Sequence, residues 1–381
     1  MTPTQGLQGA QKRPVHPERK TVFAVVGAGN GGQAMAAHLA LMGAQVILYN
    51  RSAAPLAAIW KNGGIELEGA LTGKARPWRL TSRLEQVASQ AQVLMIVVPA
   101  TAHRALATGL APHLRDGQVV ILHPGRTLGA VEFGHVLRLH GCRAQVVVAE
   151  AQSLLYAARA VRPGRVHVYG LKNQVRLAAL PATKTREVLQ ILHPYFPQFV
   201  GARNVFETSL DNVGAVFHPA PVLLNAGRIE GDAEPFDYYH RGITPAVARV
   251  LERVDAERLA VAAAYGVAVP SALEWLGQVY GARGLTLYEA LQDTAAYAGI
   301  RAPSTLDTRY LWEDVPASLV PLASLGQLAR VPCPTMRSLI HLASVIHGVD
   351  YWGLGRRAER LGLGEMNREN LHEFVQEGRV V

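Results

Sequence analysis

Residues 21–32 join an apolar run, "TVFAVV", directly to a glycine cluster, "GAGNGG". The continuous apolar run predicts a strand that is buried on both faces. The following "GQAMAAHLALMG" predicts a helix of small residues that ends at Gly43, and "AQVILYN" predicts a second buried strand. A strand, a glycine turn, a helix and a strand within about thirty residues form the β-α-β unit of a parallel sheet.

The glycine cluster has the spacing of a dinucleotide-binding loop. Gly27, Gly29 and Gly32 form the pattern G-x-G-x-x-G after a strand and before a helix. The first glycine allows a tight turn, the second lets the backbone approach a pyrophosphate, and the third lets helix and strand pack closely. The predicted cofactor-binding residues of this loop are Gly27, Gly29, Asn30, Gly31 and Gly32. The alternative is a turn that only joins a strand to a helix.

The second predicted strand ends in Asn50, Arg51 and Ser52, where an NAD site usually carries an Asp or Glu for the ribose hydroxyls. A carboxylate would repel a 2′-phosphate, whereas Arg51 and Ser52 can bind and neutralise one. We therefore expect NADP (NADPH) as the cofactor. In the alternative, Arg51 is a solvated arginine that stacks over adenine, and NAD is used.

Further apolar runs at 92–100, 118–125 and 142–151 predict more buried strands, separated by helical segments. Strands that alternate with helices specify an open α/β sheet with helices on both faces, as in the Rossmann fold. The first of these runs ends at Pro99. In such folds the loop at this position lines the nicotinamide half of the cofactor site, so we include Pro99 among the cofactor-binding residues.

A chain of 381 residues is expected to form two domains. Residues 1–19 lack the apolar segment of a signal peptide and predict a disordered tail. Residues 20–203 predict an NAD(P)-binding Rossmann domain, and residues 204–381 predict a helical domain. In the latter, Thr244 is the expected N-cap of a long helix whose first position is Pro245.

Composition narrows the class of protein. The two cysteines, Cys142 and Cys333, lie too far apart to indicate a disulfide framework or a metal site, so no metal is expected. The net charge of +9 comes from scattered basic residues, which favours anionic small molecules over nucleic acid as ligands. No apolar run approaches the ~20 residues of a membrane-spanning helix, so we expect a cytoplasmic enzyme without a membrane partner. The apolar helical half could pair into a homodimer, and the oligomeric state stays open.

Two polar segments of the helical half are candidates for the chemistry. His218 begins "HPAPVLLN", and Asn225 follows it on the same face if the helix is continuous, which makes Asn225 a predicted substrate contact. The segment "TRYLWEDVP" contains Arg309 and the neighbouring carboxylates Glu313 and Asp314. A carboxylate can orient the tautomer of a histidine, and an arginine can clamp a substrate carboxylate. From these residues alone, two alternatives stay open: His218 as a structural histidine, and the charged residues of "TRYLWEDVP" as a salt bridge within a loop.

Together these segments resemble the octopine/nopaline (opine) dehydrogenase family. The resemblance rests on "GAGNGG", "HPAPVLLNAGRIE", "YYHRGITPAVARVLERVDAERLAVAAAYGV" and "TRYLWEDVPASLVPLASLG", and it spans about residues 20–363. It implies a Rossmann domain followed by an all-helical domain like that of 6-phosphogluconate dehydrogenase, with the active site in the cleft between them. It also implies a reversible, NAD(P)H-dependent condensation of an amino acid with a 2-oxo acid, usually pyruvate, to an N-(1-carboxyalkyl) amino acid.

By motif, the resemblance implies that His218 is the catalytic histidine, that Asp314 is its partner and that Arg309 binds substrate. The glutamate beside Asp314 is the alternative partner. Glu150, in "AEAQSLLYAAR", resembles a family stretch that borders the cleft, and we predict a substrate contact there.

Two other functions are open at this stage. A ketopantoate-reductase-like enzyme or a hydroxyacid dehydrogenase would need no amine, but such enzymes usually use a lysine of the second domain, and no lysine follows Lys184. A non-catalytic NADP-sensing protein would bind the cofactor without oxidising it. The amino-acid donor is also open: Trp275 and Trp312 could line an apolar site, whereas a guanidinium substrate would need a carboxylate.

Overall fold

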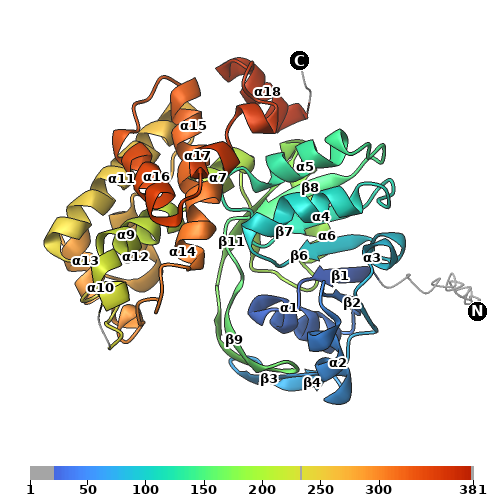
Figure 1. Ribbon diagram of the computed structural model, residues 1–381. Coiled ribbons are helices and arrows are strands. Elements are labelled where there is room, and N and C mark those ends of the chain that lie inside the picture. Colours follow the sequence, from blue (N-terminus) through green and yellow to red (C-terminus); the bar gives the residue numbers. More distant parts are fainter. Residues whose placement is uncertain (1–20, 232–233, 379–381) are drawn as a thin grey trace, which may run out of the picture.

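The computed structural model describes residues 21–231 and 234–378 (Figure 1). The disordered tail predicted for residues 1–19 lies outside these ranges. The first half of the described chain contains two sheets, and the second half is helical (Figure 1). Within the described ranges, no helix combines the length and the apolar character needed to cross a membrane.

The main sheet is built on the strands that the apolar runs predict. In the described ranges its strand order is β12-β11-β8-β7-β6-β1-β2-β5. Every neighbouring pair is parallel except β8 and β11, so the sheet is mixed, which the sequence did not indicate. The strands are β1 (Val22–Val26), β2 (Gln45–Tyr49), β5 (Arg79–Thr81), β6 (Val93–Ile96), β7 (Val119–Leu122), β8 (Val147–Ala151), β11 (Val175–Leu180) and β12 (Phe199–Gly201).

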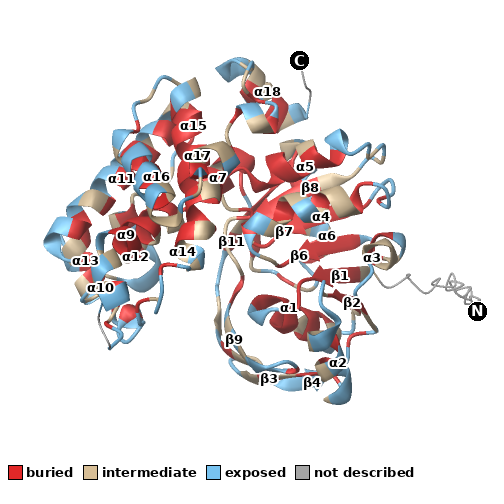
Figure 2. Ribbon diagram, viewed as in Figure 1, coloured by how far each residue is buried: buried red, intermediate tan, exposed pale blue. Residues whose placement is uncertain are grey.

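Helices cover both faces of the main sheet, as predicted. Alternate residues of a strand point to opposite faces, so each face has its own core. The central strands β1, β6 and β7 are buried along most of their length (Figure 2). Ala24 and Val26 pack with α3, α4 and α5 in a core that continues into the helical half, whereas Phe23 and Val25 pack with α1, α2 and α6. These elements are α1 (Asn30–Leu41), α2 (Ala53–Lys61), α3 (Leu84–Gln90), α4 (His103–Leu110), α5 (Gly129–Leu139) and α6 (Thr185–Leu192), with the one-turn segments η1 (Ala100–Ala102) and η2 (Ala182–Lys184).

A second, four-stranded sheet curves around α1 (Figure 1). Its order is β4-β3-β10-β9, and all four strands contact α1. The side chain of Asn30 ties the start of α1 to this sheet, because its Oδ1 accepts a hydrogen bond from the backbone N–H of Ala160 at 2.9 Å. The strands are β3 (Ile65–Gly69), β4 (Gly73–Ala75), β9 (Tyr156–Arg162) and β10 (Arg165–Leu171).

The second half of the chain is a bundle of helices. Its longest helix, α11, begins at Pro245 after the N-cap Thr244, whose side chain accepts a hydrogen bond from Val247 N, so the predicted start is confirmed. The elements are α7 (Val205–Leu210), α8 (Gly214–Phe217), α9 (Pro219–Leu224), α10 (Ala226–Gly231), α11 (Pro245–Ala264), α12 (Ala272–Tyr280), α13 (Leu287–Asp293), η3 (Ala295–Tyr297), α14 (Arg309–Trp312), η4 (Val315–Leu319), α15 (Val320–Leu328), α16 (Pro334–His347), α17 (Tyr351–Leu354), η5 (Glu359–Leu361) and α18 (Arg368–Glu377).

The C-terminal segment returns to the first half, where α18 packs on β11 and η2. Arg356 is buried in this junction and donates through Nε to Glu132 Oε2 at 2.7 Å. Its η nitrogens donate to the carbonyl oxygens of Ala100, Gly125 and Thr127. The helical half therefore fixes the loops that follow β6 and β7. The domain boundary between residues 203 and 204 stays a prediction.

The glycine motif has the geometry that its spacing predicts. Gly27 has a φ of +113°, and a Cβ there would lie 2.4 Å from the carbonyl oxygen of Val97. A Cβ on Gly32 would lie 1.8 Å from the carbonyl oxygen of Gly27, so only glycine allows α1 to pack this closely on the strand end. A Cβ on Gly29 would meet no atom within 4 Å, which leaves that side of the backbone open to a ligand.

We expect Gly32→Ala to destabilise the protein by about 2 kcal/mol or more, because the added Cβ meets a backbone atom that cannot turn aside. Gly29→Ala is the matched control: Gly29 has a φ of −78°, which alanine adopts freely, and we expect a change within about 1 kcal/mol. Urea denaturation of both variants measures the difference. If both variants lost the same free energy of unfolding, this explanation of the glycine loop would be contradicted.

Candidate active site

The parallel strands of the main sheet end at one edge, which is where open α/β sheets bind their ligands. The loops after β1, β2, β6 and β7 meet there and carry the glycine motif, Arg51, Pro99 and Arg126, respectively. The strand order places Arg51 toward the β2 side of the glycine motif, and Pro99 and Arg126 toward the β7 side. The predicted cofactor-binding residues therefore follow one another along a single edge.

The residues at the β1–β2 end of this edge fit a dinucleotide. Asn50 supports the glycine loop, because its Oδ1 accepts a hydrogen bond from Ala28 N at 3.1 Å and its Nδ2 donates to Ser52 O at 2.9 Å. The side chains of Arg51 and Ser52 are exposed. Helix α1, which is described in full, has neither a side-chain cap nor an acidic residue in its first turn. Its first N–H groups are therefore available to phosphates.

His218 and Asp314 come together from distant parts of the helical half. His218 lies where α8 ends and α9 begins with Pro219, and Asp314 directly precedes η4, a π-helical turn of the kind found at functional sites. The Nδ1 of His218 lies 2.8 Å from Oδ2 of Asp314. The ring of Tyr310 stacks on the imidazole with the centroids 4.3 Å apart. With Nδ1 engaged, Nε2 is the nitrogen left for proton exchange.

Arg126 joins the sheet edge to this pair. Its Nη1 lies 3.1 Å from Oδ1 of Asp314, and its Nε lies 3.5 Å from Oε1 of Glu313. Both carboxylates are buried, and the side chain of Arg126 is only 10% exposed. Burial would raise the pKa of Asp314, but the charges of Arg126 and His218 outweigh it and hold that pKa below its usual value. Asp314 is therefore an ionised carboxylate that can accept a hydrogen bond from Nδ1–H of the histidine.

Sequence reasoning missed Arg126, although it follows the predicted strand at 118–125 and so occupies the ligand edge. Its φ of +60° places it in the left-handed region, where non-glycine residues are uncommon and often mark functional turns.

The neighbouring carboxylates Glu313 and Asp314 have different partners. Asp314 contacts His218, whereas Oε1 of Glu313 accepts a hydrogen bond from Ala100 N at 3.0 Å. The second Glu313 oxygen lies 3.7 Å from Nε of Arg309, whose side chain is 59% exposed. Of the two, the structure brings Asp314 to the histidine, and it leaves Arg309 accessible to a ligand.

Two other predicted contacts have protein partners. Glu150 is fully buried, and its oxygens accept hydrogen bonds from Ala130 N, Thr208 Oγ1 and Ser209 Oγ at 2.7–2.8 Å. Burial raises the pKa of Glu150 despite these bonds. This carboxylate joins α5, β8 and α7 and offers no free oxygen for the predicted substrate contact, so the geometry does not support that role.

Asn225 uses its amide to hold the end of α9. Its Nδ2 donates to the carbonyl oxygens of Pro221 and Gly242, at 2.8 Å in each case. These bonds explain the position of Asn225 without a substrate, and its substrate contact stays a prediction.

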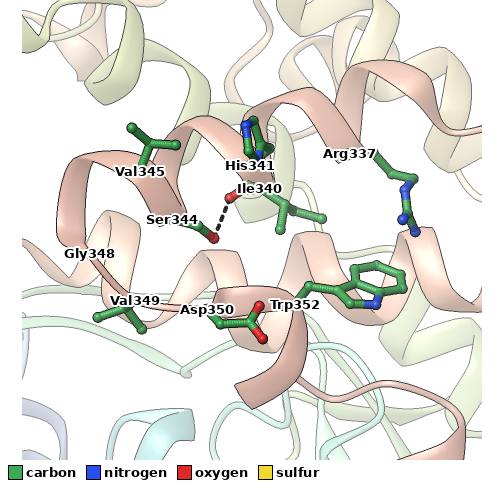
Figure 3. Close-up of a pocket in the computed structure, with 9 residues that line it drawn as sticks. All are labelled: Arg337, Ile340, His341, Ser344, Val345, Gly348, Val349, Asp350 and Trp352. Carbon is green, nitrogen blue, oxygen red and sulfur yellow. Dashed lines mark hydrogen bonds between the residues drawn. The ribbon is translucent and has the colours of Figure 1, made fainter.

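Two surface pockets on the helical half lie apart from His218 and Asp314. One, of about 480 Å³, lies between α16 and α17, where Arg337 stands 4.2 Å over the ring of Trp352 (Figure 3). The other, of about 920 Å³, is lined by Trp312. Apart from Trp312, which we named as a possible wall of an apolar donor site, no residue that we predicted for the site lines either pocket. In the described ranges, no group of three or more His, Cys, Asp and Glu side chains is arranged to hold a metal ion.

Two protein-family models match the chain. The model described as "NAD/NADP octopine/nopaline dehydrogenase, alpha-helical domain" matches residues 201–347. The model described as "NAD binding domain of 6-phosphogluconate dehydrogenase" matches residues 22–127. Among curated proteins, an opine dehydrogenase from Arthrobacter sp. (strain 1C) is 43% identical over 360 residues, which cover 94% of this chain and 99% of that enzyme.

Solved structures show the same fold. Octopine dehydrogenase with NADH and L-arginine superposes with a TM-score of 0.80 at 23% identity, covering 95% of this chain and 99% of that chain. Yersinopine dehydrogenase with bound NADP⁺ superposes with a TM-score of 0.72 at 15% identity, covering 92% and 99%. The predicted Rossmann-type domain followed by an all-helical domain is confirmed.

We expect Arg126→Met to destabilise the protein by about 3–5 kcal/mol at neutral pH, because it removes the cation that lies between the buried carboxylates of Glu313 and Asp314. Arg309→Met is the matched control, since Arg309 contacts the same glutamate from an exposed position, and its expected cost is roughly 0–1 kcal/mol. Chemical denaturation measures both.

Low pH should reduce the difference in the free energy of unfolding between Arg126→Met and the wild type. In the wild type the folded-state pKa of Asp314 is lowered, so its stabilising contribution is complete above the unfolded pKa of ~3.9 and is lost below the folded one. In the variant, Arg126 no longer offsets the effect of burial, so the folded-state pKa of Asp314 should be higher than in the wild type, and protonation at low pH should relieve part of the penalty. If the loss of stability in Arg126→Met grew as the pH fell, the assigned ion pair between Arg126 and Asp314 would be contradicted.

Proposed function

This chain belongs to the octopine/nopaline (opine) dehydrogenase family and is an NAD(P)-dependent oxidoreductase of the kind that acts on CH–NH groups. From that premise we propose that it condenses the amine of an L-amino acid with a 2-oxo acid, pyruvate in the first place. It then reduces the imine with NADPH to an N-(1-carboxyalkyl) amino acid, and the reaction is reversible. The observation that carries the proposal is the 2.8 Å contact between His218 Nδ1 and Asp314 Oδ2.

The condensation needs a group that moves a proton near neutral pH. As the amine attacks the ketone, Nε2 of His218 accepts one proton from the nitrogen and returns it to the former ketone oxygen, which gives the carbinolamine. Loss of water repeats this transfer: Nε2 takes the second proton from the nitrogen and delivers it to the leaving hydroxyl, so that the imine and water remain. Asp314 keeps the other proton on Nδ1 and stabilises the imidazolium during each transfer. When bound, NADPH supplies the hydride that reduces the imine carbon.

Arg309 is suited to bind a substrate carboxylate. Its guanidinium is largely exposed, and its contact with Glu313, at 3.7 Å, is loose enough to be exchanged for a ligand. A guanidinium can bind a carboxylate through two parallel hydrogen bonds, which fixes the orientation of the bound acid.

The rings around His218 favour an amino acid with an apolar side chain. Tyr310 stacks on the imidazole, and the ring centroid of Tyr238 lies 5.3 Å from that of Tyr310. Trp275 contacts Phe217, the residue before the histidine, with the ring centroids 6.0 Å apart. Both acidic side chains of the neighbouring segment already have cationic or backbone partners, so a guanidinium substrate would lack a free carboxylate there.

For the cofactor we propose NADP over NAD. The support is the absence of an acidic residue from the Asn50–Ser52 segment and the exposed positions of Arg51 and Ser52 after β2. Solved structures of the same fold hold NADH in octopine dehydrogenase and NADP⁺ in yersinopine dehydrogenase.

The direct test follows NADPH absorbance at 340 nm with pyruvate and a panel of amino acids. We expect oxidation only when amine and oxo acid are both present, fastest with apolar donors. Mass spectrometry should find the secondary-amine product. Oxidation with the oxo acid alone would favour a hydroxyacid dehydrogenase, and cofactor binding without any oxidation would favour an NADP sensor.

The same assay tests the proton carrier. We expect His218→Ala and Asp314→Asn each to lower kcat by about 10²–10⁴-fold, because both remove the oriented acid–base group. NADPH affinity should be unchanged, since the cofactor loop lies on other elements. Wild-type turnover in His218→Ala would exclude His218 as the proton carrier.

The cofactor preference depends on Arg51. We expect Arg51→Asp to lower the ratio of kcat/KM for NADPH over NADH by about tenfold or more, because a carboxylate repels the 2′-phosphate and binds ribose hydroxyls. Lys61→Asp, the same charge reversal at the far end of α2, is the matched control and should leave the ratio unchanged. An unaltered ratio in Arg51→Asp would show that another group selects the cofactor.

A further inference from the structure

Both substrates of the proposed reaction carry a carboxylate, so the site needs two cationic partners, and the following inference rests on that proposed function. Arg309 can supply one of them. Arg126 is not free to supply the other, because its guanidinium already pairs with Glu313 and Asp314. A second accessible cation should therefore lie near Arg126 at the ligand edge of the sheet.

The antiparallel strand β11 brings such a cation to this edge. Because β11 runs against β8, its first residues lie beside the carboxyl end of β8, with Leu177 paired to Ala151. The loop that precedes β11 therefore joins the loops that follow β7 and β8. Lys172 lies in this loop, and its backbone N–H donates to Leu155 O at 2.9 Å.

The side chain of Lys172 is held in place but not neutralised. Its Nζ donates to Oγ of Ser153, in the loop after β8, at 2.8 Å. Among the described residues, Lys172 has no carboxylate partner, whereas Lys184, at the other end of β11, pairs with Glu187 at 2.7 Å.

Lys172 is exposed and lies close enough to Arg126 to be affected by its charge. Its side chain reaches solvent, yet desolvation and the charge of Arg126 lower its pKa to about 8. A bound anion would relieve both effects, because it offsets the repulsion from Arg126 and replaces lost water contacts.

We propose that Lys172, oriented by Ser153, binds one substrate carboxylate at the β8–β11 end of the ligand edge, while Arg309 binds the other. Strand β8 lies next to β7, and the nicotinamide side of the edge lies at β6 and β7. A substrate whose carboxylate is bound by Lys172 would therefore have that carboxylate on the side away from the cofactor. Its reacting carbon would lie on the side of the cofactor and His218.

The test compares Lys172→Met with the matched control Lys184→Met in the full-length protein at pH 7. We expect Lys172→Met to raise KM for one of the two substrates by about tenfold or more, the cost of a lost charge-assisted hydrogen bond, and to leave KM for NADPH unchanged. The substrate whose KM rises is the source of the carboxylate. Lys184→Met should leave all three KM values unchanged.

The pH dependence supplies a readout that a structural role would not move. In the wild type, KM for that substrate should rise above about pH 8 as the ammonium loses its proton. Lys172→Arg should retain binding and abolish this rise, because a guanidinium stays charged. Replacing the carboxylate of that substrate by an amide should weaken binding to the wild type and have little effect in Lys172→Met.

Unchanged substrate KM values in Lys172→Met, or a rise confined to NADPH, would overturn the assignment of Lys172. If the wild type oxidises NADPH with no pair of substrates, the proposed function fails separately. Calorimetric titration of pyruvate and an amino acid into NADPH-bound wild type and Lys172→Met then decides the role of the lysine, and equal affinities would overturn it.

Discussion

The ion pair between Arg126 and Asp314 is the interaction on which the arrangement of the site depends. It joins the loop after β7 to the residue before η4, so it sets the helical half against the ligand edge of the sheet. A buried carboxylate alone would be costly, and burial would favour its protonated form. Paired with Arg126, Asp314 keeps its charge and can orient His218. One contact thus serves both the geometry of the two halves and the chemistry of the histidine.

Two other charged groups of the second half hold the loop after β6. Glu313 accepts a hydrogen bond from the N–H of Ala100, and Arg356 donates to the carbonyl oxygen of the same residue and to that of Gly125. Backbone groups at a strand end would otherwise need water or a ligand as partners. The cofactor side of the site is therefore shaped by residues more than two hundred positions downstream. This explains how a common nucleotide-binding fold can be adapted to one reaction by its second domain.

The sequence predicted well those features that depend on neighbouring residues. The glycine spacing, the β-α-β unit and the start of α11 at Thr244 are local patterns, and a family motif identified the histidine and aspartate that the structure brings together. Arg126 and the second sheet depend instead on pairings across the chain. A single arginine in a turn has no local signature, and β9 and β10 contain arginines and have half-exposed faces instead of a continuous apolar run.

Glu150 and Lys172 show how strand direction decides which charges reach a ligand. Glu150 lies inside β8, where alternate side chains point into the two cores, so its carboxylate meets α5 and α7. Ser153 lies beyond the strand end, and the antiparallel β11 places Lys172 beside it. Arg126 is close enough for its charge to contribute to the lowered pKa of that lysine, after desolvation. Arg126 already has two carboxylate partners, whereas Lys172 has none among the described residues, so it is Lys172 that can take a substrate anion at this edge.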